Sequence, residues 1–262
     1  MDYSNVHADF LQIGINTIIE PSAIIRGLKG NSKKIIIGDN VYIGHNVQII
    51  CDDFILGDYS KIHHGTNIHG YKPCEIGHNL WMGQYTILDS IGGVSIGNNC
   101  GIGAQSQLWS HMKYGDMLEG NRFLSEKKLQ IGNDVWFVGR TIVSPIIAED
   151  KSMALAGSVI TKDMKYNEIY SGVPALSISN KIGFQFNDIS LREKMDKMNS
   201  YLKESEVNTS KVKIIETPDD IVSNDISYFI VSTRQYTKKS SKAEINFMNF
   251  LLPEKAKFTP IY

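Results

Sequence analysis

The chain contains 262 residues, with 27 basic and 28 acidic side chains, so it is long enough for one sizeable core and a small appendage. The balanced charge gives no overall field that favours nucleic acid or an acidic membrane surface as a partner. The three cysteines lack metal-ligand spacing, the N-terminus is unlike a signal sequence and no apolar run approaches about 20 residues. We therefore expect a soluble, cytoplasmic protein with no transmembrane segment and no metal.

Aliphatic residues recur every six positions from residue 13 onward, in groups of three, and the step between groups lengthens to 12, 7, 8, 8 and 23 residues. Three six-residue segments form one turn of a three-sided parallel coil, so these recurring residues should point inward and stack on the coil below. The surplus residues should all leave the coil at one corner. We call the recurring residues anchors: Ile13, Ile19, Ile25, Ile37, Ile43, Ile49, Leu56, Ile62, Ile68, Ile76, Met82, Leu88, Ile96, Ile102, Leu108, Ile131, Phe137 and Val143.

A glycine follows the first anchor of every group, and we expect it to adopt a positive φ at a tight corner. Four residues after the first and second anchors the side chains are mostly small or β-branched, with Leu80 as the bulky exception. The alternative, a β-sandwich with coincidental spacing, is disfavoured because all six groups keep the same phase. The glycines are Gly14, Gly38, Gly57, Gly77, Gly97 and Gly132.

The longest interruption spans residues 109–130, and His111 lies at its beginning, three residues after the anchor Leu108. A neutral imidazole can take a proton from an attacking hydroxyl, a contribution of about 10²–10⁴-fold in rate. The alternative is a surface histidine in a polar loop. A base needs a partner that fixes its tautomer; the candidates are Asp116, Glu119 and a backbone carbonyl, of which we favour the carbonyl or Glu119.

Residues 179–262 lose the period of six and predict an α/β appendage after a coil domain at 1–178. A helical face around residues 191–202 begins with the capping-box pair Ser190 and Glu193. "KVKIIET" and "ISYFIVS" read as strands, and a second helix should begin at Ser241 and end before Pro253. A basic cluster there either binds a phosphorylated or anionic ligand or is solvated: Arg234, Lys238, Lys239 and Lys242.

The segments "IIIGDNVYIG", "VSIGNNCGIG", "LQIGNDVWFVG" and "ALAGSVITKD…YSGVPA" resemble the hexapeptide-repeat acyltransferases. The resemblance covers about residues 13–178 and implies a mainly β fold, a left-handed parallel β-helix of about seven coils. It also implies a homotrimer with active sites in the clefts between subunits. "QLWSHMKYGD…LQIGNDVWFVGRTIV" is similar to the sugar O-acetyltransferase branch, which implies that His111 is the catalytic base and that acetyl-coenzyme A lies near Trp136.

For coenzyme A, small residues in the last coils would let the pantetheine arm approach the backbone, and basic residues would meet its phosphates. The family's usual "GVPAK" ends here in Leu176, so Lys181 is the substitute. An oxyanion would be stabilised by backbone N–H groups. The expected cofactor residues are Trp136, Gly139, Arg140, Ala156, Gly157, Ser158, Lys162 and Lys181.

For the acceptor, the residues that follow the third anchors form a column of Ile50, His69, Asp89, Trp109 and Ser144. If this column faces outward, Asp89 and Trp109 floor the acceptor pocket; otherwise the corner is filled by its own neighbours. Gln84 is the nearest amide where the family has a substrate-binding asparagine. The expected acceptor residues are Gln84, Asp89, Trp109, Tyr114, Asp116, Glu119 and Arg122.

The resemblance thus implies an acetyl-coenzyme-A-dependent O-acetyltransferase that acts on a cell-surface polysaccharide or its precursor. A sugar-nucleotide N-acetyltransferase and a non-catalytic coil remain alternatives. A third is a γ-carbonic-anhydrase-like metalloenzyme, for which His64 and His69 have the required spacing of five.

Overall fold

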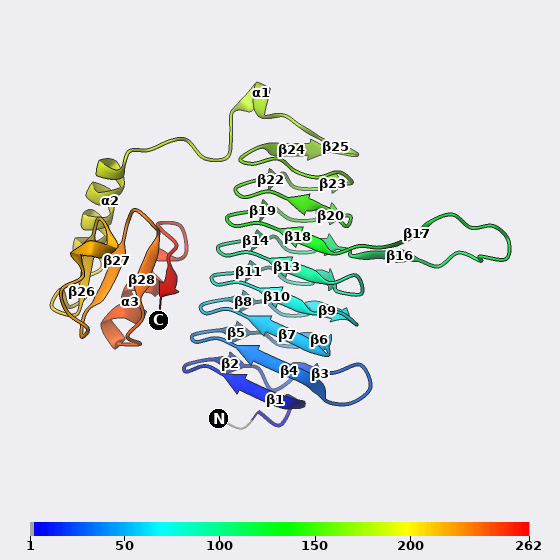
Figure 1. Cartoon of the computed structure of the whole chain (residues 1–262), viewed down its shortest axis with the longest axis horizontal. Coiled ribbons are helices and arrows are strands. Elements are labelled where there is room, and N and C mark those ends of the chain that lie inside the picture. The colour runs from blue at the N-terminus through cyan, green and yellow to red at the C-terminus, as the bar shows by residue number, and fades with distance from the viewer. Residues whose placement is uncertain (1–2, 262) are drawn as a thin grey trace. The chain divides into compact units, whose positions relative to one another are not determined.

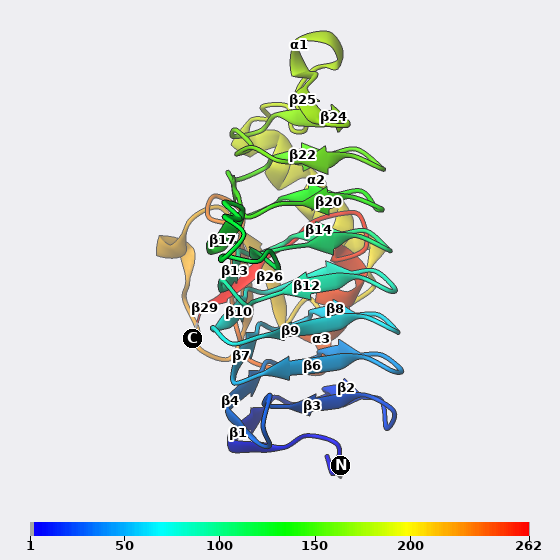
Figure 2. The same ribbon diagram turned by 90° about the vertical axis from the view of Figure 1, so that its right-hand side faces the viewer.

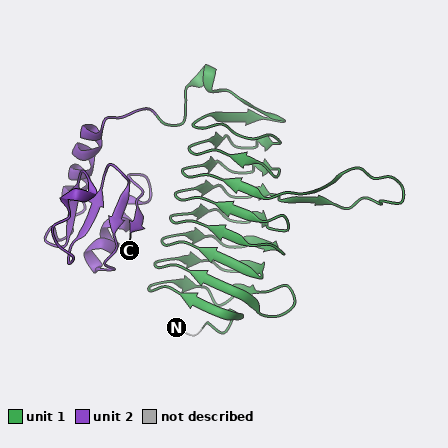
Figure 3. Cartoon of the chain, in the orientation of Figure 1, with its two compact units in different colours: residues 1–186 green, residues 187–262 purple. Residues whose placement is uncertain are grey.

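The computed structural model describes residues 3–261, and the chain divides into two compact units, Met1–Phe186 and Asn187–Tyr262 (Figure 3). The first unit is a stack of coils, each of which contributes one short strand to each of three sheets (Figure 1). None of the helices within residues 3–261 is long and apolar enough to cross a membrane.

The strands of each sheet are parallel, apart from the last pair of the nine-stranded sheet. The first sheet contains β1 (Ala8–Ile13), β4 (Ser32–Ile37), β7 (Asp53–Leu56), β10 (Cys74–Ile76), β13 (Val94–Ile96), β18 (Leu129–Ile131) and β21 (Ile147–Ala148). The second contains β2 (Ile18–Ile19), β5 (Tyr42–Ile43), β8 (Lys61–Ile62), β11 (Trp81–Met82), β14 (Gly101–Ile102), β19 (Trp136–Phe137), β22 (Met153–Ala154), β24 (Ile169–Gly172) and β25 (Ala175–Ser177). The third contains β3 (Ile24–Arg26), β6 (Gln48–Cys51), β9 (Asn67–Gly70), β12 (Ile87–Asp89), β15 (Gln107–Leu108), β20 (Ile142–Val143) and β23 (Val159–Ile160).

We name the corners in chain order. The first corner joins the first sheet to the second, the second corner joins the second sheet to the third, and the third corner leads into the next coil. The anchors face the interior, where they stack in register, as Leu88, Leu108 and Val143 do on β12, β15 and β20. All anchors are buried except Ile13 and Ile19 of the first coil, which are half-buried. The predicted period-six coil is confirmed.

The glycines after the first anchors are required for a different reason from the one we expected. None of the six has a positive φ. A Cβ atom on Gly57 would instead lie 2.6 Å from the backbone of Gly77 in the next coil, and the other five would also meet their neighbours within 3.0 Å. These glycines therefore allow close approach between coils. The positive φ falls two residues later, mostly on asparagine, as in Asn40 (φ 55°) and Asn99 (φ 64°), a residue that tolerates this conformation.

Polar side chains at the first corner link each coil to the one before it. Asp58 Oδ1 accepts the N–H of Asp39 at 2.8 Å, and His78 Nδ1 accepts the N–H of Asp58 at 2.9 Å. The oxygen Oδ1 of Asn98 then accepts the N–H of His78 at 2.8 Å, and Asn133 continues the series. This ladder satisfies backbone donors that the turn leaves without a strand partner.

The surplus residues leave at the third corner, as predicted. Residues 27–31 emerge between β3 and β4, and the longest interruption emerges between β15 and β18. The latter forms a hairpin of β16 (His111–Lys113) and β17 (Leu124–Glu126), paired antiparallel with His111 opposite Glu126. Figure 1 shows this hairpin extending away from the coils, and in Figure 2 it points toward the viewer.

The coil unit continues beyond the expected boundary at residue 178, because the next segment packs on the coils. Ser179 begins the short helix α1 (Ser179–Ile182), and its hydroxyl accepts the N–H of Ile169 at 2.7 Å. Gln185 donates to the carbonyl of Asp134 at 3.2 Å.

The second unit contains a four-stranded sheet in the order β26-β27-β28-β29, together with two longer helices. The predicted helices are confirmed as α2 and α3, with the capping box at Ser190 and the N-cap at Ser241. Two predicted strands are confirmed as β26 and β27, but β28 and β29 were not predicted. The elements are α2 (Leu191–Glu204), β26 (Val212–Ile215), η1 (Pro218–Asp220), β27 (Ser227–Ile230), β28 (Gln235–Thr237), α3 (Lys242–Leu251) and β29 (Thr259–Ile261).

Candidate active site

His111 lies at the third corner beside a carboxylate that the coil itself supplies. Its Nδ1 is 2.8 Å from Oδ2 of Asp89, which ends β12 one coil earlier. The imidazole is about one-fifth exposed, whereas Asp89 has no exposed surface. An ionised carboxylate can only accept, so Nδ1 carries the proton and Nε2 keeps a lone pair that can take one. His111 thus has the tautomer of a general base.

Asp89 is held by the residue that precedes the histidine. Oδ2 of Asp89 accepts the backbone N–H of Ser110 at 2.8 Å and its hydroxyl at 2.6 Å. The same hydroxyl accepts the N–H of Gly92 at 2.8 Å, so its only proton is directed at Asp89. Three donors converge on this one buried oxygen and fix the plane of the carboxylate. Asp89 therefore orients His111.

Two of our expectations about this corner need correction. Glu119 and a carbonyl were favoured as the partner of His111, but the partner is Asp89. Asp89 was also expected to floor the acceptor pocket, yet its burial leaves it no surface for a ligand. Trp109 does lie next to the base, with its ring centroid 6.2 Å from that of His111 in an edge-on arrangement.

The base of the hairpin is braced by ion pairs. Glu126, opposite His111 in the ladder, pairs with Lys113 across the hairpin and with Lys72 of the loop between β9 and β10, the latter at 2.8 Å. Hydrogen bonds from Lys113, and next from Lys72, lower the pKa of Glu126 to about 2. The carboxylate is therefore ionised at any physiological pH, and the strand that carries His111 stays tied to the coils.

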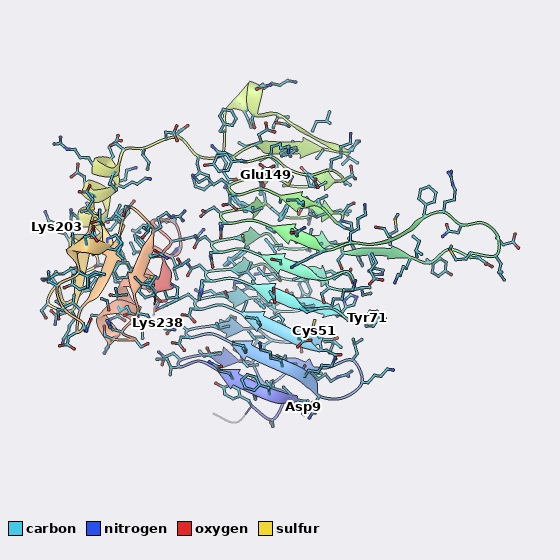
Figure 4. The ribbon with its side chains drawn as sticks, viewed as in Figure 1. Asp9, Cys51, Tyr71, Glu149, Lys203 and Lys238 are labelled. Carbon is cyan, nitrogen blue, oxygen red and sulfur yellow. The ribbon has the colours of Figure 1, made fainter. Side chains whose placement is uncertain are left out.

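The other expected acceptor residues of the interruption lie on the distal part of the hairpin. Tyr114, Asp116, Glu119 and Arg122 are all exposed. Asp116 accepts the N–H of Leu118 at 2.8 Å, and the guanidinium of Arg122 lies over the ring of Phe123 at 6.0 Å. They form an arm that extends from the base rather than a pocket around it. Figure 4 shows side chains distributed along the whole arm and labels Tyr71, an exposed residue of the loop after β9.

A second group of expected site residues gathers at the second corner. Gln84 lies there between β11 and β12, and its carbonyl accepts the N–H of Gln105 in the next coil at 2.8 Å. Gln105 in turn accepts a hydrogen bond from Arg140 Nε at 2.8 Å. Gly157 follows one coil later, with its N–H 3.0 Å from the carbonyl of Gly139. Within one chain the third sheet separates this column, which also includes Ala156, from His111.

The remaining expected cofactor residues are scattered. Trp136 is 45% exposed on the second sheet and lies over Gly101, where an added Cβ would be 3.0 Å from the indole. Ser158 is fully buried and donates to the carbonyl of Leu155 at 2.6 Å, so it is not available to a ligand. Lys162 is exposed at the third corner two coils beyond His111, and Lys181 is exposed in α1.

The histidines considered for a metal have other neighbours. His64 packs edge-on against Tyr85 with ring centroids 5.1 Å apart, and His69 faces Asn67 and Asp89. Over residues 3–261, no group of three histidine, cysteine or acidic side chains is placed to hold a metal ion.

The basic residues that we grouped in the second unit do not all lie at one site. Arg234 donates to the carbonyl of Lys257 at 3.3 Å, whereas Lys239 and Lys242 line a cavity of about 720 Å³ together with Lys211. Glu206 and Asp225 also line this cavity, so its charge is mixed.

Sequence reasoning missed Ser110 and the brace at Glu126. A signal for Ser110 exists only in three dimensions, because its role depends on the coil below. The sequence did hold a signal for the pairing of His111 with Asp89. Asp89 and Trp109 belong to the same column, and His111 follows Trp109 by two residues. Because side chains two apart on a strand share a face, His111 could have been placed beside Asp89.

No family model matches the chain. Among curated proteins it is 25% identical to the bifunctional protein GlmU of Listeria monocytogenes over 205 residues, which cover 66% of this chain and 40% of GlmU. It is 31% identical to the galactoside O-acetyltransferase of Escherichia coli K12 over 115 residues, which cover 42% of this chain and 53% of that enzyme. The chain thus spans less than half the length of the GlmU relatives that it matches.

Similar solved structures include the polysialic acid O-acetyltransferase OatWY and the polySia-specific acetyltransferase NeuO. OatWY has 19% identity and a TM-score of 0.41, with 68% of this chain and 91% of that chain covered. NeuO has 18% identity and a TM-score of 0.47, with 75% and 91% covered. The N-acyltransferase AntD from Bacillus cereus has 18% identity and a TM-score of 0.46, with 74% and 92% covered.

The chain's own period of six, its three parallel sheets and the galactoside O-acetyltransferase match agree with one another. The chain thus has the architecture of a parallel β-helix with a period of six, and over 42% of its length it is similar to a galactoside O-acetyltransferase.

Proposed function

We propose that the protein transfers an acetyl group from acetyl-coenzyme A to a hydroxyl of a carbohydrate, with His111 as the general base. The observation that carries this proposal is the 2.8 Å contact between Nδ1 of His111 and the buried carboxylate of Asp89. An imidazole that is about one-fifth exposed and has a fixed tautomer, at the base of a projecting hairpin, is placed to meet a substrate. The similarity to a galactoside O-acetyltransferase supports a carbohydrate acceptor.

The proposed reaction has two steps. Nε2 of His111 takes the proton of the acceptor hydroxyl while its oxygen bonds to the thioester carbonyl carbon, which forms a tetrahedral oxyanion. The carbon–sulfur bond then breaks, the carbonyl re-forms as an ester, and the imidazolium returns its proton to the thiolate of coenzyme A. Asp89 stabilises the imidazolium between the two steps without accepting its proton.

The acceptor would lie between the coil and the arm. Trp109 offers an aromatic surface beside the base, and aromatic faces pack well against the apolar faces of sugar rings. Tyr114, Asp116, Glu119 and Arg122 on the arm supply a ring and polar groups that can close over a longer glycan.

We further propose that the complete site requires a homotrimer. Gln84, Arg140 and Ala156 lie at the second corner and His111 at the third, so packing the second corner of one copy against the third corner of the next would bring them together. Large apolar side chains support such contacts, because Trp81, Trp136 and Ile142 are between 42% and 45% exposed on the second and third sheets. Exposed large apolar side chains on these outer faces would be buried by such a contact. Lys162 and Lys181 remain candidates for the coenzyme A phosphates.

The test measures coenzyme A release from acetyl-coenzyme A with a panel of glycans and nucleotide sugars, for the wild type and His111→Ala. An O-acetyltransferase should lose about 10²–10⁴-fold in rate. Substantial residual transfer to an amino sugar would favour the N-acetyltransferase alternative, because an amine needs less help from a base. Failure of the wild type to bind acetyl-coenzyme A by calorimetry would contradict both and favour a non-catalytic coil. Sedimentation tests the trimer.

A further inference from the structure

Asp89 faces a second imidazole, that of His69, from the coil on its other side. His69 on β9 is the Cα partner of Asp89 on β12. Its Nε2 is 3.7 Å from Oδ1 of Asp89, the oxygen that His111 does not use. The His69 side chain is 37% exposed, whereas Asp89 is fully buried. One buried carboxylate thus lies between two histidines.

A positive charge close to Asp89 would stabilise its buried carboxylate. A buried carboxylate is costly unless it is paired and hydrogen-bonded. Oδ2 has three close donors, but Oδ1 has only the N–H of Ile91 at 3.4 Å and the ring of His69. Over residues 3–261, the basic side chains within 4.0 Å of Asp89 are the imidazoles of His69 and His111.

The ring of His69 has an oxygen atom near each of its two nitrogens. Nδ1 of His69 is 3.0 Å from Oδ1 of Asn67, whose amide nitrogen points to Gln48 Oε1 at 3.5 Å. Both ring nitrogens therefore face oxygen atoms, one of Asn67 and one of Asp89. A neutral imidazole has one lone pair and would direct it at one of these oxygens, whereas the doubly protonated ring directs an N–H at each.

His111 has the opposite requirement. It can take a proton from a substrate only while Nε2 keeps its lone pair, and it would lose that lone pair if it supplied the charge that balances Asp89. We propose that His69 carries the positive charge that balances Asp89, so that His111 stays uncharged and ready to act as the base. His69 is then a positioning residue that acts through Asp89, and this inference rests on the proposed role of His111.

Within the described part of the chain, the groups packed around His69 add no unpaired charge next to its ring. From β6, its Cα partner Ile50 is apolar and Gln48 is neutral. Lys72, in the loop after β9, is paired with Glu126 at 2.8 Å. Cys51 of β6 acts on Asp89, but burial raises the pKa of its thiol to about 11, so the thiol is neutral at pH 7. Over residues 3–261, the charged contacts of the ring are therefore Asp89 directly and His111 through it.

The first experiment reads the protonation states of the rings and needs no activity. In protein with ¹⁵N-labelled histidine at pH 7, we expect both ring nitrogens of His69 to be protonated and His111 to carry a proton on Nδ1 alone. His69→Gln and His111→Gln assign the signals by deletion. A neutral His69 ring, or a doubly protonated His111, in the wild type would overturn the inference. This result is readable even if the protein transfers no acetyl group.

The second experiment follows the charge when His69 is replaced. His69→Gln keeps a donor near Asp89 but removes the charge, so we expect His111 to become doubly protonated at pH 7 in the same spectra. With an active acceptor, kcat at pH 7 should fall about tenfold and recover at higher pH, because the acid limb of the profile moves up by about two pH units. The KM for acetyl-coenzyme A should not change.

The matched control is His7→Gln, which replaces an exposed histidine of the first coil and should leave the spectra of both site rings and the pH profile unaltered. If His69→Gln behaves like His7→Gln, with His111 still neutral and the acid limb unmoved, the assignment of the charge to His69 is wrong. A loss of activity in His69→Gln that is equal at every pH would also contradict it.

Discussion

The first and third corners both join neighbouring coils through polar side chains, but they use histidine in opposite ways. At the first corner, His78 Nδ1 accepts a backbone N–H from Asp58 at 2.9 Å. At the third corner, His111 Nδ1 donates to a buried carboxylate at 2.8 Å and leaves Nε2 free. The comparison teaches that a histidine on this coil holds a turn in place when its Nδ1 accepts a backbone N–H, and can act as a base when its Nδ1 donates to a carboxylate and leaves the lone pair on Nε2.

Among the substitutions that test this comparison, Asp89→Asn should cause the largest loss of kcat. The amide keeps the size of the side chain but cannot fix the same tautomer and does not stabilise the imidazolium, so kcat should fall by about 10²-fold or more. The NH₂ group of the asparagine would also face the hydrogen-bond donors that Asp89 now accepts from, which should lower the unfolding free energy by about 1–3 kcal/mol. Steady-state kinetics and thermal denaturation measure the two effects. Unchanged kcat would show that Asp89 does not orient the base.

Gly57→Ala sharpens the account of the first corner. The new Cβ would lie 2.6 Å from Gly77, so we expect a loss of about 1–3 kcal/mol in stability as the coils separate. Gly57→Asn should be worse.

The control is Gly157→Asn, because Gly157 has φ 74° and open space around its Cα, and asparagine tolerates that conformation. Its melting temperature should stay close to that of the wild type. If both asparagine variants melt alike, close approach is not what requires Gly57.

His78→Ala tests the histidine that holds a turn in place. It leaves the N–H of Asp58 without its acceptor, so the unfolding free energy should fall by about 1 kcal/mol, while kcat stays near the wild-type value. His78→Asn should retain most of the stability, because Asn98 performs the same task one coil later. A large loss of kcat in a folded His78→Ala protein would contradict the claim that His78 has a structural role only.

The smallest expected effect concerns Glu126. Its pKa is lowered to about 2 in the folded protein, first by Lys113 and then by Lys72. The group therefore stabilises the hairpin base above its ordinary pKa, and this contribution is lost as the pH falls from about 4.5 toward 2. Because the pair is largely solvated, the effect should be small. Hydrogen exchange of β16 and β17 should rise over that pH range in the wild type, and Glu126→Gln should show the faster exchange already at neutral pH.

The coil was predictable in detail because a strict period of six leaves one way to stack the anchors, from Ile25 to Val143. The corner glycines were placed correctly but explained wrongly, since their role depends on the neighbouring coil rather than on their own φ. In the second unit, β28 and β29 are three residues each, too short for a periodic signal to show them.

The site was predictable in part. His111 stood out because the repeat stops beside it, but its partner lies 22 residues earlier in sequence and is adjacent only because one coil returns the chain to the same column. Tyr114, Asp116, Glu119 and Arg122 were chosen because their side chains can bind a sugar, but they lie on the distal part of the hairpin, away from His111. Residues at the second corner were grouped with His111 although the third sheet lies between them within one chain.

The most direct test of the central claim compares coenzyme A release by His111→Ala and His78→Ala, with circular dichroism to confirm that both are folded, against an acceptor that the wild type acetylates. We predict that His111→Ala loses at least about 10²-fold in rate while His78→Ala keeps a rate near that of the wild type and melts at a lower temperature. Retention of full activity by His111→Ala would contradict the assignment of His111 as the base.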